Sequence, residues 1–365
     1  MVLSQPAAPP TALWVVPVSD LAGVARHVLD VARAGIPGWR LVVLAPPGDL
    51  PARLRDAGAA VLERPFGPDH GLRASTASLC HVVRTLRPAV VHSHLAYADI
   101  VVALAAGRGQ RLVTTEHGIA RDDTVYHRSS ARTRAMAAVH TARLRRFDAV
   151  IAVSRATADA MVEKWRPRVP PVVVPNGVEM VARLAPLAPR PPHDAPQPGL
   201  RILSLARLAP EKRLPDLLDA FAVLRRDHSE ARLTLAGTGP EEGALRAQVD
   251  RLGLGDAVAL PGHLDAERAM AEHDVLAMLS VWENCSYALL DAATRGMGVV
   301  ASDVGGNPEI LPPTSLVDAD DTAAVAAALA VQGLDVTARP TLGDWPTVED
   351  MCARIAATYA SAGAG

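Results

Sequence analysis

Short apolar runs alternate with longer amphipathic stretches over residues 11–175. Apolar runs of this length are typical of strands buried on both faces, and the stretches between them, such as Ser75–Leu86 and Ser129–Phe147, have a helical period. The predicted strands are Leu13–Val18, Arg40–Ala45, Ala59–Glu63, Ala89–Ser93, Arg111–Thr115, Ala149–Val153 and Val172–Val174. Repeated strand–helix units predict an α/β fold with a parallel sheet and helices on both faces.

A second series of the same kind follows residues 180–199, a stretch rich in proline and alanine that we interpret as a linker. Its predicted strands are Arg201–Leu205, Ala231–Ala236, Ala257–Leu260, Val275–Leu279, Val299–Ser302 and Ser315–Val317. The two series predict two Rossmann-like domains, residues 1–178 and 179–344, with a last helix at about Thr347–Ser361 in the segment 345–365. Ligands of open parallel sheets bind beyond the carboxyl ends of the strands.

Composition narrows the class of protein. The 365 residues have room for two domains. A net charge of −2 with a pI near 6.6 does not indicate a nucleic-acid-binding protein. Lysine occurs only at Lys164 and Lys212, and the excess of arginine, alanine and proline is typical of a GC-rich bacterial source. The three cysteines have no disulfide or metal spacing, which indicates a reducing cytoplasm. We expect no signal peptide and no transmembrane helix, while peripheral membrane contact and oligomeric state stay open.

The stretch Ser280–Asp291 carries the first candidate chemistry, because it joins a predicted buried strand to a predicted helix. It holds two carboxylates, Glu283 and Asp291, with seven residues between them. The free N–H groups that open a helix bind anions, and carboxylates accept hydrogen bonds from hydroxyls. Phosphate beside a polyol is the chemistry of a sugar nucleotide.

The loop Ser204–Arg213 carries the second candidate chemistry, because it joins the first strand of the second series to an amphipathic helix. Arg207 can clamp phosphate oxygens with its planar fork, and Lys212 adds a mobile point charge. A lysine at this position is notable in a chain that uses arginine almost everywhere else. The competing interpretation is a pair of solvated surface cations.

The motif around Glu283 resembles the signature of retaining glycosyltransferase family 4 of the GT-B fold. The family pattern is Glu-x7-Glu, followed by Gly-x-Pro-Val-Val-Ala-x-x-x-Gly-Gly-x-x-Glu-Ile. This chain has Glu283-x7-Asp291 and then Gly296-Met297-Gly298-Val299-Val300-Ala301, followed by Gly305-Gly306 and Glu309-Ile310. It departs from the pattern at Asp291, which is one methylene shorter than glutamate, and at Gly298, where proline is usual.

The resemblance implies two Rossmann-like domains that face each other across a cleft, with the last helix packed back on the first domain. The second domain would bind the nucleotide-sugar donor and the first the acceptor. Arg207, Lys212 and the amides of Tyr287 and Ala288 would stabilise the leaving diphosphate, so no metal or other cofactor is expected. The sugar hydroxyls would bind Glu283 and the amides of Asn284, Cys285 and Ser286, and the ribose diol would bind Asp291.

Further positions match the family less distinctively. Gly23 stands in a turn similar to the family's Gly-Gly-x-x-x-His-Val, where a glycine lets backbone approach a ligand. His117 matches a histidine close to the reacting sugar, although a structural histidine is an equal alternative. His263 follows a strand where the family contacts the nucleotide base. His92 and His94 predict a structural pair rather than a metal site. Asp318-Ala319-Asp320 predicts a helix cap rather than the metal-binding Asp-x-Asp of other glycosyltransferases.

The sequence leaves several alternatives open. The donor could be of the UDP-glucose, UDP-N-acetylglucosamine or GDP-mannose type. A small soluble or natural-product-like acceptor is favoured over a lipid-linked one, because no strongly basic amphipathic helix is present beyond the small cluster Arg143, Arg145 and Arg146. A sugar-nucleotide epimerase of the same fold and a non-catalytic sugar-nucleotide-binding protein are the competing functions.

Overall fold

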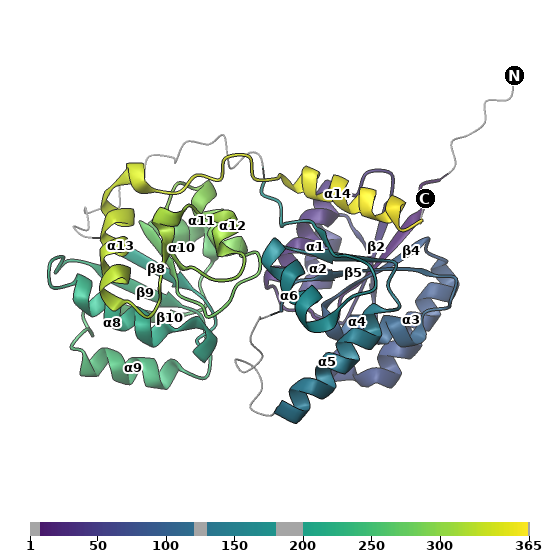
Figure 1. The fold of residues 1–365 in the computed structure, drawn as a ribbon, viewed down its shortest axis with the longest axis horizontal. Helices are drawn as coiled ribbons and strands as arrows, with labels where there is room; N and C mark the ends of the chain where they lie inside the picture. The colour runs from purple at the N-terminus through teal and green to yellow at the C-terminus, as the bar shows by residue number, and fades with distance from the viewer. Residues whose placement is uncertain (1–7, 120–129, 180–199, 364–365) are drawn as a thin grey trace, which may run out of the picture. The chain divides into compact units, whose positions relative to one another are not determined.

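Both strand series form parallel sheets in the computed structural model, which describes residues 8–119, 130–179 and 200–363. Contacts divide the chain into two units, which are residues 1–177 with 346–365 (unit 1) and residues 178–345 (unit 2). The predicted linker 180–199 and the polar loop 121–123 after His117 lie outside the described residues. Figure 1 shows the helices and strands of each unit.

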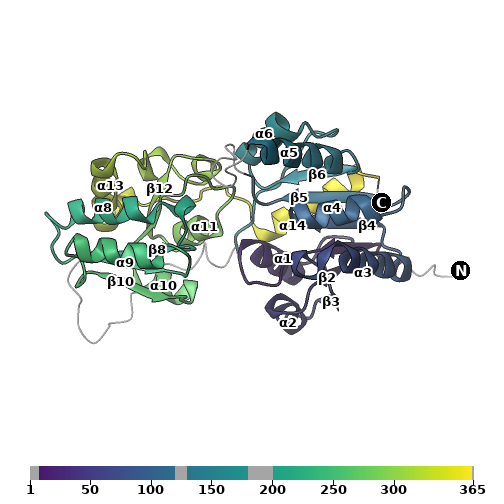
Figure 2. The same cartoon turned by 90° about the horizontal axis from the view of Figure 1, so that it is seen from below.

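Unit 1 is a seven-stranded sheet in the order β3-β2-β1-β4-β5-β6-β7, which can be followed in Figure 2 from β3 and β2 at one edge to β6 near the other. Its strands are β1 (Thr11–Val15), β2 (Arg40–Ala45), β3 (Ala60–Glu63), β4 (Val90–His94), β5 (Arg111–Glu116), β6 (Ala149–Ala152) and β7 (Val172–Val173). Its helices are α1 (Gly23–Ala34), α2 (Asp49–Asp56), α3 (Gly71–Leu86), α4 (Leu95–Ala105), α5 (Ser130–Leu144), α6 (Arg155–Trp165) and α14 (Val348–Ser361).

The alternation of side chains along β1 separates two cores. Ala12, Trp14 and Val16 point into one core with residues of α1, α2 and α14. Leu13 and Val15 point into the other with residues of α3, α4, α5 and α6. Because successive side chains of a strand face opposite sides of the sheet, an apolar run covers both faces, as the sequence predicts.

The last helix, α14, packs on unit 1 and confirms the expectation that it returns to the first domain. Thr347 and Asp350 close its start with a capping box. Tyr359 is fully buried, and its hydroxyl accepts a 2.7 Å hydrogen bond from Trp14 Nε1. Gly177 lies so close to the backbone of Thr347 that an added Cβ would stand 2.3 Å from its carbonyl oxygen, so the crossover needs glycine there.

Unit 2 is a six-stranded sheet in the order β10-β9-β8-β11-β12-β13. Its strands are β8 (Arg201–Leu205), β9 (Arg232–Ala236), β10 (Val258–Gly262), β11 (Val275–Met278), β12 (Gly298–Ser302) and β13 (Leu316–Val317). Its helices are α8 (Leu214–Leu224), α9 (Glu242–Arg251), α10 (Ala266–Glu272), α11 (Tyr287–Thr294), α12 (Asn307–Ile310) and α13 (Thr322–Leu334). Residues of α8, α9 and α13 pack on one face in a single core.

Candidate functional site

The candidate site in unit 2 lies at the carboxyl ends of β8 and β11, which are neighbours in the sheet. The loop after β8 contains Arg207 and Lys212, and the loop after β11 contains Glu283. A backbone hydrogen bond of 2.9 Å from Val281 N to Glu211 O joins the two loops. Parallel pairing therefore brings together two motifs that are about seventy residues apart in sequence.

Lys212 and Glu283 form an ion pair. Lys212 Nζ lies 2.5 Å from Glu283 Oε1 and 3.4 Å from Ser280 Oγ. The two side chains are 23% and 16% exposed, so solvent still reaches both. The sequence assigned them to the diphosphate and to the sugar respectively, without predicting the pair. Each side chain balances the charge of the other.

Arg207 is the more accessible cation, with 64% of its side chain exposed, and it pairs with Glu211 four residues later in the same loop. Partial burial raises the pKa of the Glu211 carboxyl, but the hydrogen bond from Arg207 and the charges of Arg207 and Lys212 outweigh it and hold that pKa below its usual value. Glu211 thus stays ionised beside both cations. The sequence motif did not single out Glu211, although its place between Arg207 and Lys212 is a usable signal.

Four glycines fix the backbone of these loops. Gly306 N donates to Glu283 O at 2.9 Å, and a Cβ on Gly305, which has φ +54°, would lie 2.0 Å from that same oxygen. Gly237 and Gly239 approach the carbonyls of Ala206 and Leu208 in the same way. A side chain at Gly237, Gly239 or Gly305 would displace the loop that carries Arg207 or Glu283, so these three positions require glycine.

Helix α11 begins at Tyr287. Ser286 is its N-cap and accepts a 3.5 Å hydrogen bond from Leu289 N, so the amides of Tyr287 and Ala288 lie in the first turn. Asn284 Oδ1 accepts a 3.4 Å hydrogen bond from Trp282 Nε1, and Cys285 is buried. Asp291 is half-buried one turn into the helix, with Oδ1 3.9 Å from Arg295 Nη1.

Two other positions predicted in unit 2 lie apart from this group in sequence and in the sheet. His263 is exposed just after β10, the edge strand. In the Asp-x-Asp segment, the cap of α13 is the following residue, Asp321, whose side chain accepts from Ala324 N at 2.9 Å. Asp320 instead pairs with Arg213 at 2.5 Å, so the predicted cap was assigned one residue too early.

Unit 1 gathers histidines at the carboxyl ends of β4 and β5 and on α1. His94 Nδ1 lies 2.9 Å from His117 Nε2, and the His27 ring lies 4.8 Å from the His117 ring between centroids. His27 and His94 are buried, whereas His117 is partly exposed. Gly23 is the first residue of α1, and a Cβ there would meet no atom within 4 Å. In the sequence, His27 is the histidine of the turn motif that contains Gly23.

A hydrogen-bond relay fixes the tautomer of His92. Trp14 Nε1 can only donate, so the Tyr359 hydroxyl accepts from it and donates to His92 Nδ1 at 2.7 Å. His92 Nε2 then carries the proton that it donates to Thr115 Oγ1 at 2.7 Å. This satisfied arrangement is the structural role predicted for His92. His94 differs, because its Nε2 has no hydrogen-bond partner among the described residues.

Burial sets the protonation of this cluster. It lowers the pKa of His27 to about 4, against a smaller opposing effect of the hydrogen bond to Asn176. Burial and the neighbouring imidazoles lower the pKa values of His92, His94 and His117 well below their usual value. The four rings are therefore neutral at physiological pH.

A buried ionic group, which includes Glu116, lies next to His117 in unit 1. Arg143 contacts Asp99 and donates to Glu116 Oε2 at 3.0 Å, and all three residues are buried. Burial raises the pKa of Glu116 to about 7, although the amides of Gly118 and His117 oppose this. Arg143 thus belongs to the core rather than to the basic surface cluster that the sequence indicated, because its side chain turns inward from α5.

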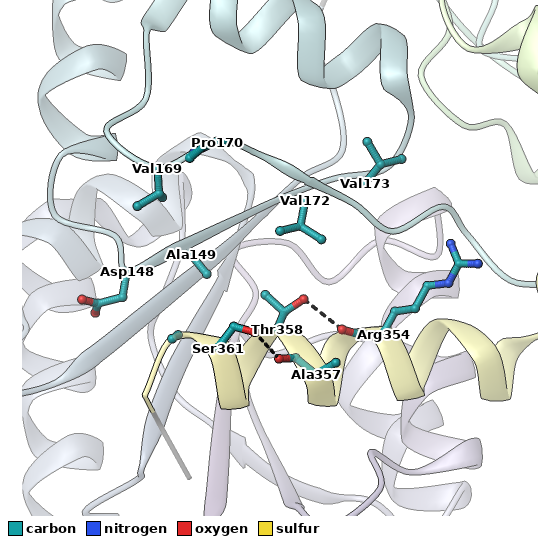
Figure 3. A pocket seen from close by; sticks show the side chains of 11 residues that line it. Asp148, Ala149, Val169, Pro170, Val172, Val173, Arg354, Ala357, Thr358 and Ser361 are labelled. Atoms are coloured by element: carbon teal, nitrogen blue, oxygen red, sulfur yellow. Dashed lines mark hydrogen bonds between the residues drawn. The ribbon is translucent and has the colours of Figure 1, made fainter.

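A pocket of about 320 Å³ lies elsewhere in unit 1, between the β6–β7 edge and α14. Figure 3 shows its lining, which includes Val172, Val173, Thr358 and Ser361. The hydroxyls of Thr358 and Ser361 donate to carbonyls of their own helix. None of the predicted site residues lines this pocket, so we do not assign the proposed chemistry to it.

Two family models match the chain. The model described as Glycosyltransferase Family 4 matches residues 21–181, and the model described as Glycosyl transferases group 1 matches residues 199–331. Among curated proteins, the chain is 28% identical over 324 residues to a glycogen synthase of Mycobacterium tuberculosis, which covers 80% of this chain and 77% of that protein. It is 30% identical over 198 residues to a putative colanic acid biosynthesis glycosyltransferase of Escherichia coli, covering 51% and 48%.

Solved structures share the fold at low identity. The Anabaena protein HepE, in complex with UDP-glucose, aligns with a TM-score of 0.75 and 19% identity over 97% of both chains. A sucrose-phosphate synthase from Thermosynechococcus elongatus aligns with a TM-score of 0.68 and 19% identity over 96% of both. Within the described parts of the chain, no helix combines the length and the apolar character needed to span a bilayer.

Proposed function

Because the chain belongs to the family 4 glycosyltransferases of the GT-B fold, we propose that it transfers a sugar, with retention, from a nucleotide-diphospho-sugar to a hydroxyl of a small acceptor. Unit 2 binds the donor and unit 1 the acceptor. The observation that carries the proposal is the Lys212–Glu283 pair of 2.5 Å beside the first turn of α11. It places a cation, a carboxylate and helix-opening amides at one edge of one sheet.

The leaving diphosphate determines the electrostatics of the step. As the glycosidic bond breaks, negative charge grows on the diphosphate, and Arg207, Lys212 and the amides of Tyr287 and Ala288 stabilise it. For this to happen the diphosphate must compete with Glu211 and Glu283 for the two cations. Lys212 then exchanges a carboxylate for a phosphate oxygen, which releases Glu283 to accept a hydrogen bond from a sugar hydroxyl.

The remaining positions orient the donor. The amides of Asn284, Cys285 and Ser286 bind sugar hydroxyls, Asp291 accepts from the ribose diol, and His263 lies near the base. The acceptor hydroxyl attacks the face that the diphosphate leaves, and the leaving phosphate takes the acceptor proton. No protein nucleophile is needed. In unit 1, His117 contacts the reacting sugar and helps to orient the acceptor, with Gly23 leaving room at the start of α1.

A UDP-sugar is the first donor to test, because structures of the Anabaena relative HepE contain UDP and UDP-glucose. UDP-N-acetylglucosamine and GDP-mannose are the next. Thermal shift with each sugar nucleotide identifies the donor, and product analysis with candidate acceptors then tests transfer. Epimerised sugar nucleotide without an acceptor-dependent product would favour the epimerase. Donor binding without any turnover, across a broad acceptor panel, would favour the binding protein.

Transfer should not require added Mg²⁺ or Mn²⁺, because Arg207 and Lys212 occupy the role that a hard cation plays at other diphosphate sites. Initial rates measured with and without each ion check this. A strict requirement for either ion would contradict the proposed charge stabilisation.

A further inference from the structure

We propose that unit 1 binds one transition-metal cation of the Zn²⁺ class at His27, His94 and His117. This goes beyond the proposed transferase activity, and it contradicts the expectation from sequence that His94 belongs to a purely structural pair. Each of the three rings brings one nitrogen within 4.8 Å of the others. They come from α1, β4 and the segment after β5, so only the fold assembles them.

The spacing of the rings suits a tetrahedral ion. The ring centroids are 5.6 Å apart for His27 and His94, 4.8 Å for His27 and His117, and 5.2 Å for His94 and His117. An ion about 2.0–2.1 Å from one nitrogen of each ring in tetrahedral geometry would hold the centroids roughly 5.2 Å apart. The three observed separations bracket this value, and the ligand nitrogens, which lie within 4.8 Å of one another, would approach to roughly 3.4 Å on binding.

His27 can offer its Nε2 atom to a metal ion, because its other ring nitrogen, Nδ1, makes the hydrogen bond to Asn176. His27 Nδ1 lies 3.1 Å from Asn176 Oδ1, and because an amide oxygen accepts, Nδ1 carries the proton. His27 Nε2 is then a bare lone pair, fully buried, with no hydrogen-bond partner among the residues that the structure describes. A ligating histidine whose other nitrogen donates to an oxygen is the usual second-shell arrangement of metal sites.

His94 and His117 already face each other through one nitrogen each, at 2.9 Å. Two neutral imidazoles at this distance share one proton. A cation that takes both facing nitrogens leaves each ring with its proton on the other nitrogen, which for His94 is Nε2, an atom with no hydrogen-bond partner among the described residues. The ring of His94 is held from behind by Trp14 and by His92, at centroid distances of 4.4 and 4.6 Å.

The donor set selects the cation. Neutral imidazole suits Zn²⁺, Cu²⁺, Ni²⁺ and Co²⁺, whereas Mg²⁺ and Ca²⁺ prefer oxygen ligands. Three histidines leave one position of a tetrahedral ion open, as in catalytic rather than structural zinc sites. Because His117 is partly exposed, that position is open to a water molecule or another oxygen ligand on its side.

Metal content tests the proposal without any enzyme assay. The full-length protein, stripped with a chelator and dialysed, is titrated with Co²⁺ and then with Zn²⁺ against a chromophoric competitor. We expect one equivalent of Co²⁺ with the intense visible absorption of a four-coordinate ion, and its displacement by Zn²⁺. A large excess of Mg²⁺ should leave the spectrum unchanged.

Variants locate the ion. His94→Ala and His117→Ala should each abolish the four-coordinate spectrum, and Asn176→Ala should weaken Zn²⁺ binding by about 10–100-fold. His81→Ala removes an exposed imidazole of α3 and should bind like the wild type. Circular dichroism checks folding, and His117→Ala, at the partly exposed position, keeps the test valid if the buried variant misfolds. Absence of stoichiometric binding, or binding unchanged in His117→Ala, would overturn the proposal while leaving the transferase proposal intact.

Discussion

The two units differ in the polar side chains near the carboxyl ends of their strands: unit 1 has imidazoles and unit 2 has pairs of charged residues. Unit 1 gathers imidazoles of which three are buried and one is partly exposed. Unit 2 presents Lys212 and Arg207, which solvent reaches and which pair with Glu283 and Glu211. The strand–helix architecture is the same in both, so the side chains at the strand ends and their burial decide the chemistry. Desolvation keeps the imidazoles of unit 1 neutral, whereas the accessible cations of unit 2 can exchange a carboxylate for a phosphate.

The largest expected difference between the units is in their response to acid. Between pH 6.5 and 4 the histidines bind protons in the unfolded chain, whereas the buried imidazoles of the folded protein stay unprotonated. The unfolding free energy of unit 1 therefore falls as pH falls. His27, with its pKa lowered to about 4, contributes roughly 3 kcal/mol by itself, and His92, His94 and His117 add to it. Glu116, with its pKa raised to about 7, opposes them.

Hydrogen exchange in urea at pH 7.5 and pH 5, on chelator-treated protein, resolves the two units. No described histidine of unit 2 is buried, so unit 2 serves as the internal control. Unit 1 should lose several kcal/mol relative to unit 2. Equal losses in both units would show that the imidazoles of unit 1 are not protected from protonation.

The next effect concerns the cations of unit 2. Arg207→Ala and Lys212→Ala should each lower kcat by about 10²–10³-fold, because they stabilise charge that grows on the leaving diphosphate, with a smaller rise in the donor KM. Arg268→Ala is a matched control, since Arg268 also pairs with a glutamate four residues later on the surface of unit 2. Turnover near the wild-type value in both site variants would mean that these residues are an ordinary solvated pair.

A smaller effect is expected at Asp291. Asp291→Asn keeps the shape of the side chain but removes its charge, and donor binding should weaken by about 1–3 kcal/mol. Calorimetric titration with the donor, alongside Asp250→Asn on the exposed face of α9, measures this. If the affinity does not change, the ribose is held elsewhere, and the shorter side chain has moved the family's contact.

The smallest effect tests whether Glu211 competes with the diphosphate. Glu211→Gln removes the carboxylate partner of the exposed Arg207, so UDP should bind more tightly, by less than about 1 kcal/mol, and the gain should fade at high salt. Titration with UDP at two ionic strengths measures it. Weaker binding would instead mean that Glu211 holds Arg207 in position for the ligand.

The sequence by itself determined the elements and their motifs. The strands of both sheets lie within three residues of their predicted bounds because their apolar runs and the turns between them are local signals. The helix-opening amides after Glu283 could be located for the same reason, since a strand, its loop and the next helix are consecutive in the chain. The return of α14 to unit 1 followed from the family resemblance rather than from any local pattern.

Only the tertiary structure decided which groups meet. Lys212 and Glu283 touch because β8 and β11 are neighbours in the sheet, a strand order that no local pattern contains. Arg143 belongs to the core because its side chain turns inward, although its neighbours in sequence suggested a basic surface. His27, His94 and His117 are separated by other elements and approach only through the pairing of β1, β4 and β5. Their neutrality is also a tertiary effect, since desolvation depends on what packs around a ring and not on the residues beside it in the chain.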